Sequence, residues 1–381
     1  MRRLAMIREL ENAADIVYRA MTPTPQQRWP LLDERCGAAV WVKHENHTAI
    51  GAFKVRGGLV YLDDLRRRQP DVNGIVAATR GNHGQAVAFA AARYGMRSVV
   101  FVPHGNSTGK NNAMRALGAE LVEEGHDFQA SLEAAEQFAR SRGWHMVPSF
   151  HPLLARGAAT YSLELLRAVP DLDTLYVPIG LGSGICGAIA ARDALGCRTK
   201  IVAVVAASAP AYARSLALGR LVSHDVSTRI ADGMACRTPV QEALDIIRAG
   251  VDRLVEVSDG QIEDAMRGIY DDTHNVAEGA AAASLAALLS ERERVRGRSV
   301  GIVLTGANVD ADVFARVLAS DSHVNRRRHP HMADEPEYVR RGKGRKDQVG
   351  RSGIYPASAA DAPEDAEVRG HDEQGDEGRR K

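Results

Sequence analysis

Short runs of apolar, β-branched residues alternate along the chain with longer Ala- and Leu-rich stretches of helical periodicity. This alternation is typical of βαβ units, in which helices cover a parallel sheet. The predicted strands are 39–42, 75–78, 98–102, 119–123, 174–178, 200–206, 253–257 and 299–304. The predicted helices include 84–94, 128–142, 184–195, 240–248 and 261–271. The fold class is therefore α/β, with parallel-rich twisted sheets and flanking helices.

The pattern changes after residue 320. From 321 to 381 charged residues, Gly and Pro dominate, and apolar periodicity is almost absent. Such a segment cannot bury enough apolar surface to offset the entropy of ordering it, so we predict a disordered, charged tail over 321–381. The remaining length exceeds what one hydrophobic core usually serves, which favours two packed lobes or one large α/β domain.

Composition excludes several classes of protein. The 49 basic and 48 acidic residues leave a net charge of +1, so bulk charge does not direct the chain to nucleic acid or to an anionic membrane. The first residues carry Glu9, Glu11 and Asp15 where a signal peptide would be apolar, and no apolar run is long enough to span a bilayer. The four cysteines form no CxxC pair, which argues against structural zinc. We expect a cytoplasmic protein with a small-molecule partner.

A glycine-rich turn follows the predicted strand 174–178. Residues 182–187 read G-S-G-I-C-G, which matches the dinucleotide-binding pattern at the start of a helix. That pattern also needs an acidic residue at the end of the next strand, and this strand ends in Val205, Ala206 and Ala207. What remains is a helix N-terminus whose free N–H groups can hold a phosphate. A plain strand–helix turn explains the same residues equally well.

Three further clusters carry polar chemistry. Lys54 lies in G-A-F-K-V-R-G-G, where it is either a surface side chain with its head in water or a buried amine with a lowered pKa that can form a Schiff base. Residues 79–85 read T-R-G-N-H-G-Q directly after strand 75–78, so this turn points backbone donors at an anion. Thr305 follows strand 299–304, at the sheet edge where α/β proteins bind ligands.

Taken in their order along the chain, the four clusters resemble those of the pyridoxal-phosphate enzymes of fold type II. This is the tryptophan synthase β-like fold, and the resemblance is to its serine/threonine dehydratase branch. The resemblance extends over residues 22–319. It implies pyridoxal 5'-phosphate as the cofactor and a homodimer or homotetramer. It also implies a large cofactor-binding domain over 1–68 and 149–320, and a small domain over 69–148.

The resemblance assigns roles to particular residues. Lys54 would form the Schiff base and, once freed by the substrate amine, remove the proton from the substrate Cα. Asn82 would hydrogen-bond the phenolic oxygen of the cofactor, and Thr305 its ring nitrogen. The other cofactor-binding residues would be Phe53, Gly180, Leu181, Gly182, Ser183, Gly184 and Glu278, with the backbone of 180–184 at the phosphate. The substrate carboxylate would meet the turn formed by Thr79, Arg80, Gly81 and His83.

Two departures from the family pattern affect the interpretation. Arg80 stands where racemases place a serine and where threonine dehydratases keep a small residue, so we expect no racemization. Ala207 and Tyr212 stand where metal-dependent relatives carry acidic ligands, so we predict no metal site.

The resemblance implies a dehydratase, or ammonia-lyase, that removes water from L-threonine or L-serine and releases a 2-keto acid and ammonia. The sequences of the turns also resemble those of dehydratases of hydroxyectoine utilization, so a larger hydroxylated amino acid is an alternative substrate. A catalytically idle ligand-binding homologue is a third interpretation. The presence of both Lys54 and Asn82 argues against it, because a binding protein needs no Schiff-base amine.

Overall fold

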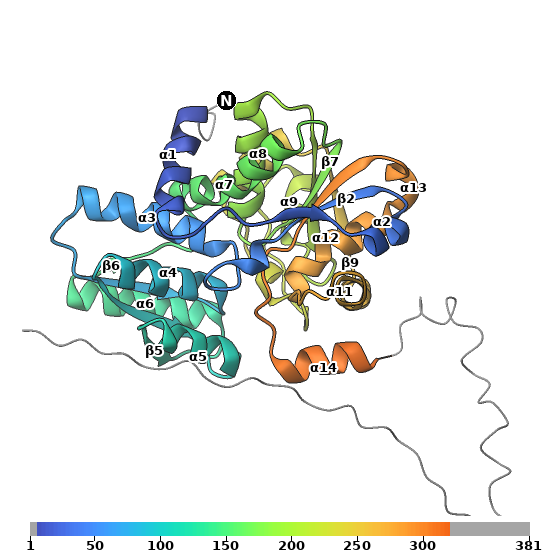
Figure 1. Cartoon of the computed structure of the whole chain (residues 1–381). Helices are drawn as coiled ribbons and strands as arrows, with labels where there is room; N and C mark the ends of the chain where they lie inside the picture. The colour runs from blue at the N-terminus through green and yellow to red at the C-terminus, as the bar shows by residue number, and fades with distance from the viewer. Residues whose placement is uncertain (1–5, 321–381) are drawn as a thin grey trace, which may run out of the picture. The chain divides into compact units, whose positions relative to one another are not determined.

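The computed structural model describes residues 6–320, and the predicted tail over 321–381 lies outside the described residues. The described strands form two sheets (Figure 1). The six-stranded large sheet has the order β1-β2-β10-β7-β8-β9 and the four-stranded small sheet the order β5-β4-β3-β6. The strands are β1 Gln26–Arg28, β2 Ala39–Lys43, β3 Gly74–Ala78, β4 Arg97–Val102, β5 Glu120–Glu123, β6 His145–Met146, β7 Thr174–Pro178, β8 Lys200–Ala206, β9 Arg253–Val257 and β10 Ser299–Val303.

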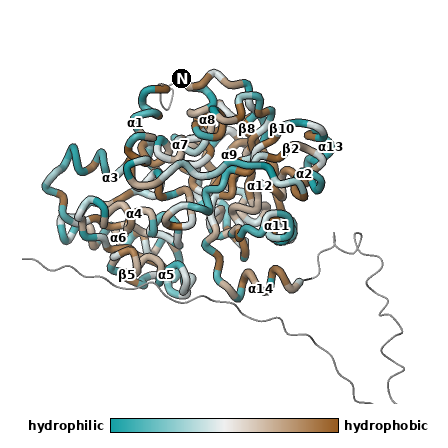
Figure 2. Tube along the Cα trace, in the orientation of Figure 1, coloured by the Kyte–Doolittle hydropathy of each residue, from teal (hydrophilic) through white to brown (hydrophobic). Residues whose placement is uncertain are grey.

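The large sheet is parallel except for β1, which pairs with β2 in antiparallel register. Every residue of β7 is buried, as expected for a parallel strand with helices on both faces. One face carries α1 (Ile7–Tyr18), α7 (Pro152–Ala168), α8 (Ser183–Leu195), α9 (Ala211–Leu218) and α10 (Gln241–Gly250). The other carries α2 (Pro30–Cys36), α11 (Asp259–Thr273) and α12 (Gly279–Ser290), followed by α13 (Arg292–Val295). The apolar sequence of α12 accounts for its almost complete burial (Figure 2).

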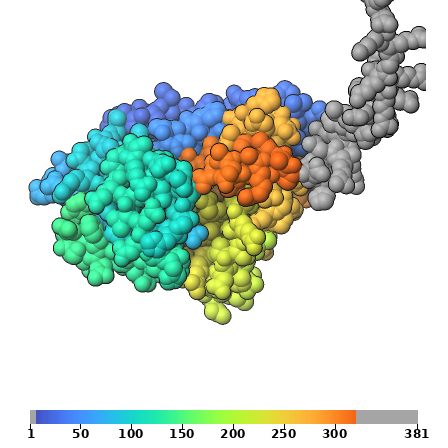
Figure 3. All heavy atoms as spheres, turned by 90° about the horizontal axis from the view of Figure 1, so that it is seen from below, coloured from blue at the N-terminus to red at the C-terminus, as the bar shows by residue number. Residues whose placement is uncertain are grey.

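The small sheet is entirely parallel. Its helices are α3 (Lys54–Arg68), α4 (Asn82–Arg93), α5 (Thr108–Ala116) and α6 (Phe128–Arg142). Ile75 and Ala77 of β3 face α3 and α4, whereas Val76 and Ala78 face α6, so alternate residues of one strand enter two cores. The residue before α5 also contacts the residue before α14 (Ala311–Ala319), since Ser107 Oγ donates to Asp310 Oδ1 over 2.7 Å; α14 lies beside this part of the chain in Figure 3.

The alternating pattern predicted the strands well. All eight predicted strands are confirmed, three of them with the same bounds, and the sequence missed only the short strands β1 and β6. The α/β class is also confirmed. Helices α4 and α8 begin at Asn82 and Ser183, slightly before the predicted starts at 84 and 184, because polar residues at a helix start interrupt the apolar period without breaking the helix. The domain boundaries at 68 and 149 stay predictions.

A buried network of four charged side chains ties the start of α3 to its surroundings. Arg56 Nε donates to Glu45 over 2.7 Å, and Arg56 Nη1 donates to Glu164 of α7 over 2.6 Å. Lys43 of β2 donates to the other oxygen of Glu164, also over 2.6 Å. The side chains of Arg56, Lys43 and Glu45 are wholly buried and that of Glu164 almost so, so each charge depends on its partners. The network fixes the helix turn that carries Lys54.

Within the described range, no helix combines the length and the apolar character needed to cross a bilayer.

Candidate active site

The four polar clusters of the sequence meet where strands of both sheets end. The segment before Lys54 pairs with the segment after β10, through an antiparallel bridge between Ala52 and Gly306. The amide of Phe53 donates to the carbonyl of Thr305 over 3.0 Å. Lys54 is the first residue of α3, so this pairing places its side chain at the carboxyl end of the large sheet, where open α/β sheets bind ligands.

The Lys54 amine lies between the two glycine-rich turns. Its Nζ donates to Ser183 Oγ over 3.2 Å. Burial lowers the pKa of Lys54 to about 8, although the carboxylate of Glu278 opposes the shift. An amine that loses its proton near neutral pH is a competent nucleophile and base. A small pocket at this amine is lined by Phe53, Lys54, Gly57, His83, Leu154, Ala158 and Ser183.

The turn between β7 and α8 is a cradle of exposed backbone. Gly182 has φ +106°, and a Cβ at this residue would lie 2.8 Å from Ala243 Cβ, so only glycine fits. A Cβ at Gly180 would likewise collide with the carbonyl of Gly233. The helix α8 begins at Ser183, so the amides of its first turn have no partner within the helix. These amides can bind an anion such as a phosphate.

Asn82, at the start of α4, is held by two residues of the large-sheet side. Its Nδ2 donates to Glu278 Oε1 over 2.7 Å, and its Oδ1 accepts from Asn308 Nδ2 over 2.8 Å. Glu278 is buried, and its Oε2 makes no hydrogen bond to the described residues. Burial raises the pKa of Glu278 to about 7, with Lys110 opposing the shift. Asn82 and Glu278 therefore form one hydrogen-bonded unit beside Lys54. Their contacts with a cofactor stay predictions.

Sequence reasoning missed two residues behind this unit. Lys110 of α5 is 7% exposed, forms an ion pair with Asp232, and its Nζ lies 3.8 Å from Glu278 Oε2. Its alkyl chain passes beneath Gly81, where a Cβ would lie 2.5 Å from Lys110 Cδ. Nothing in the sequence of α5 distinguishes Lys110 from a solvent-exposed lysine, so only the tertiary structure could reveal it.

Part of the backbone of the turn from Thr79 to Gly84 is already hydrogen-bonded within the turn. Thr79 Oγ1 accepts from the amides of Gly81 and Gly84, over 2.9 and 3.3 Å. Two donors near the predicted carboxylate site thus bond within the turn. The side chain of Arg80 is exposed, and among residues 6–320 it pairs with no carboxylate, including Glu278. His83 Nε2 is buried without a partner in the described chain, and burial lowers the pKa of His83 to about 3, so the ring is neutral.

Thr305 is buried at the end of β10, and the described chain offers its hydroxyl no hydrogen bond. His44 and His47 both form hydrogen bonds to other side chains. His44 Nε2 accepts from Trp29 Nε1 over 3.2 Å, and His47 Nε2 lies 2.8 Å from Asn275 Oδ1. Residues 6–320 contain no cluster of three His, Cys, Asp or Glu side chains arranged to hold a metal ion.

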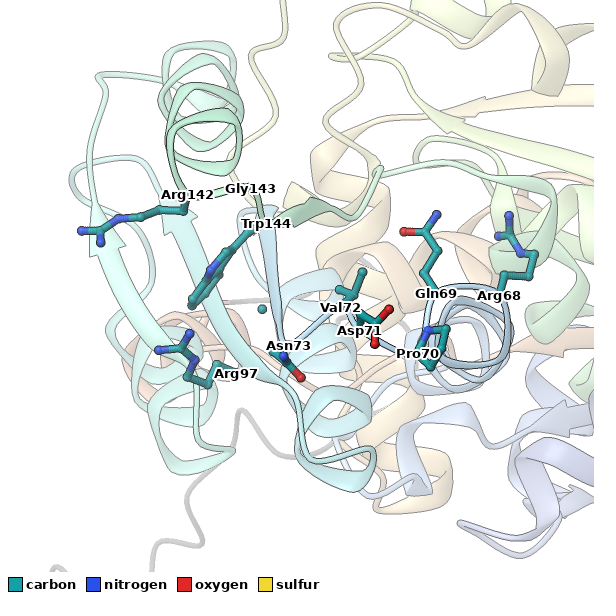
Figure 4. Close-up of a pocket in the computed structure, with 11 residues that line it drawn as sticks. Arg68, Gln69, Pro70, Asp71, Val72, Asn73, Arg97, Arg142, Gly143 and Trp144 are labelled. Carbon is teal, nitrogen blue, oxygen red and sulfur yellow. The ribbon is translucent and has the colours of Figure 1, made fainter.

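A larger and more open hollow lies elsewhere, at the amino ends of β3 and β4 (Figure 4). Three arginines line it, and each already has a partner. Arg97 stacks on the Trp144 ring at 4.7 Å, Arg142 lies 5.7 Å over the Phe138 ring, and Arg68 pairs with Asp64. The hollow contains none of the predicted site residues, so we assign the chemistry to the smaller pocket at Lys54.

The comparison with protein families gives a match over most of the chain. The family of pyridoxal-phosphate dependent enzymes matches residues 17–306. The chain belongs to this family. Its cofactor is pyridoxal 5'-phosphate, which supplies a conjugated electron sink for the electrons released at the substrate Cα. The described residues fit the cofactor, because Lys54 offers an amine and the 180–184 cradle offers amides. Glu278 Oε2 and His83 Nε2 are buried polar atoms that make no hydrogen bond to the described residues.

Similar proteins cover several amino-acid reactions. The L-threonine ammonia-lyase of Geobacter sulfurreducens is 36% identical over 286 residues, which is 75% of this chain and 71% of that protein. The L-threo-3-hydroxyaspartate ammonia-lyase of Saccharomyces cerevisiae is 28% identical over 309 residues, 81% of this chain and 94% of that protein. A pyridoxal 5'-phosphate-dependent aspartate racemase superposes with a TM-score of 0.77 at 28% identity, over 82% of this chain and 98% of the racemase.

Proposed function

We propose that this protein is an ammonia-lyase that eliminates water from a β-hydroxy amino acid, with L-threonine or L-serine as substrate. The products are a 2-keto acid and ammonia. The Lys54 amine, with a pKa lowered to about 8 and its Nζ on Ser183, is the observation that carries the proposal. The threonine and hydroxyaspartate ammonia-lyases among the similar proteins support it.

The residues of the chain divide the work. Lys54 takes the Cα proton of the substrate, because burial keeps a substantial fraction of its amine unprotonated near neutral pH. Ser183 holds that amine in place, and the turn after β3 receives the substrate carboxylate. Asn82 and Thr305 orient the ring of the cofactor. Thr305 is neutral, so it does not hold a proton on the ring nitrogen of the cofactor as a carboxylate would. This favours prompt loss of the β-hydroxyl group.

Arg80 supports a second candidate substrate. Its guanidinium is exposed and is unpaired within the described chain, on a turn that borders the pocket. A guanidinium binds carboxylates through a planar fork, so a substrate with a distal carboxylate or another polar group would gain a contact there. The yeast relative is named for such a substrate, 3-hydroxyaspartate. A larger hydroxylated amino acid, as in hydroxyectoine degradation, fits the same observation.

A substrate panel tests the proposal and separates its two forms. Release of keto acid is measured with L-threonine, L-serine and L-threo-3-hydroxyaspartate for the wild type, Lys54→Ala and Arg80→Ala. Lys54→Ala should abolish release from every substrate. If threonine or serine is the substrate, Arg80→Ala leaves its kcat/KM within about threefold, whereas the loss of a charge-assisted contact to a polar substrate costs about ten- to a hundredfold. Wild-type activity retained in Lys54→Ala contradicts the proposal. The homodimer or homotetramer stays a prediction, which light scattering of the purified protein would check.

A further inference from the structure

Two buried tyrosines donate hydrogen bonds to backbone carbonyls of the 180–184 turn, which is the predicted phosphate site. Tyr212 of α9 donates its hydroxyl to the carbonyl of Leu181 over 2.9 Å. Tyr161 of α7 donates to the carbonyl of Gly184 over 3.2 Å. Both side chains are buried, at 1% and 0% exposure, and burial raises the pKa of each phenol well above its usual range. Both hydroxyls therefore stay protonated and donate throughout the working pH range.

These bonds determine where the amides of the turn point. In a planar trans peptide, the carbonyl and the following N–H point in opposite directions. Holding the Leu181 carbonyl toward Tyr212 turns the N–H of Gly182 to the other side of the turn. Amides at a helix N-terminus bind anions only when they converge on one point. The tyrosines thus act on the feature that makes the turn a phosphate site.

Tyr212 has more to fix than Tyr161. The peptide after Leu181 lies outside the helix and precedes Gly182, whose backbone at φ +106° has the freedom of glycine. The Gly184 carbonyl lies inside α8, where helical geometry already sets its direction. The Tyr212 hydroxyl also accepts from the amide of Val240 over 3.4 Å, which joins the turn to the start of α10.

We propose that Tyr212, supported by Tyr161, is a positioning residue that preorganises the 180–184 turn for the phosphate of the cofactor. The proposal goes beyond the lyase reaction, because it concerns how the cofactor is held and not which substrate reacts. It also gives a role to Tyr212, which the sequence marked only as a position without an acidic ligand.

The test uses three Tyr→Phe variants, each of which removes one buried hydroxyl and keeps the ring. Tyr212→Phe and Tyr161→Phe act on the turn. Tyr176→Phe is the matched control, because Tyr176 is equally buried and its hydroxyl donates to Glu291 over 2.8 Å, away from the turn. The dissociation constant of pyridoxal phosphate is measured by titrating the cofactor-free protein. Loss of one hydrogen bond weakens binding by about two- to tenfold, so we expect about tenfold for Tyr212→Phe, about twofold for Tyr161→Phe and no change for Tyr176→Phe.

A second ligand separates positioning from general damage to the fold. Pyridoxal lacks the phosphate, so its affinity should be the same for Tyr212→Phe and the wild type. The ³¹P resonance of the bound phosphate should move in Tyr212→Phe and stay in place in Tyr176→Phe. The proposal is overturned if Tyr212→Phe weakens pyridoxal as much as pyridoxal phosphate, or if the control weakens the phosphate ligand equally. None of these measurements depends on the amino-acid substrate, so failure of the proposed lyase reaction would leave them unchanged.

Discussion

The two glycine-containing turns of the site follow parallel strands and begin helices, yet they use their backbones in opposite ways. In the turn between β3 and α4, the amides of Gly81 and Gly84 bond inward to the hydroxyl of Thr79. In the turn between β7 and α8, the carbonyls of Leu181 and Gly184 bond to tyrosines behind the turn, and the amides are left to face an anion.

The difference shows that a glycine-rich turn after a strand does not specify one kind of site. In the first turn, two backbone amides are already hydrogen-bonded within the turn, so ligand contacts depend largely on side chains, above all those of Asn82 and His83. In the second turn, backbone amides make the ligand contacts, so binding depends on the geometry of the helix start and on the groups that support it. Substitutions in the two turns should therefore affect different steps.

Gly182→Ala should have the largest effect, and it should act on the cofactor. The residue has φ +106°, and a Cβ there would lie 2.8 Å from Ala243 Cβ, so the turn must shift. Left-handed backbone alone costs a non-glycine residue about 1–2 kcal/mol. With the added collision, we expect cofactor affinity to fall by about a hundredfold, measured by titration of the cofactor-free protein.

Gly196→Ala is the matched control for Gly182→Ala. Gly196 ends α8 at φ +67°, and no atom lies within 4 Å of a Cβ built there. This variant should lower thermal stability through backbone strain and leave cofactor affinity unchanged. Equal loss of affinity in both variants would show that strain anywhere in α8, rather than the shape of the turn, controls cofactor binding.

Thr79→Ala should have an intermediate effect, and it should act on the substrate. Removing the hydroxyl leaves the amides of Gly81 and Gly84 without their acceptor, so the turn loses its shape. We expect KM for the amino acid to rise about tenfold, as for one or two lost hydrogen bonds, with the dissociation constant of the cofactor within about twofold of wild type. Thr79→Ser keeps the acceptor and should restore KM. If Thr79→Ala releases the cofactor instead, the two turns do not divide their roles as described.

Glu278→Gln should alter stability rather than ligand affinity, and the change should depend on pH. Glu278 contacts the first turn through its hydrogen bond with Asn82. Burial raises the pKa of Glu278 to about 7, so the folded protein holds this proton more tightly than the unfolded chain. The stabilising contribution is complete below the ordinary carboxyl pKa and is lost as the pH rises toward 7. The wild type should therefore lose on the order of 2 kcal/mol relative to Glu278→Gln between pH 4.5 and pH 8. Denaturant unfolding of the cofactor-free protein measures this difference.

Glu291→Gln provides the opposite case. Hydrogen bonding by Arg253 holds the pKa of Glu291 below its usual value, although burial acts in the opposite direction. This carboxylate is therefore charged at both pH 6 and pH 8. The stability lost in Glu291→Gln should therefore be similar at pH 6 and pH 8. A flat difference for Glu278→Gln over the same range would mean that its carboxyl remains ionised in the folded protein.

The parts of the fold and site that sequence could predict are those written in contiguous residues. Strand β7 and helix α6 have the predicted bounds because their apolar period is uninterrupted. Lys54 was singled out because the residues around it resemble a family motif, whereas its flanking glycines alone left a surface side chain as an alternative. Lys110 was missed because its partner Glu278 is far away in the sequence and its own helix looks ordinary. Thr79 shows a third case, since the sequence placed it in the turn and only the structure reveals that its hydroxyl accepts hydrogen bonds from the turn itself.

The buried set of Lys43, Glu45, Arg56 and Glu164 constrains how this sequence can change during evolution. The set contains two cations and two anions, so removing any one member leaves an opposite charge without its full complement of partners in the protein interior. Replacing all four together with apolar residues of similar volume is far less harmful than replacing one. Descendants of this chain should therefore keep the whole quartet or exchange its members jointly. A lineage that loses one charge should carry a compensating substitution at another of these positions.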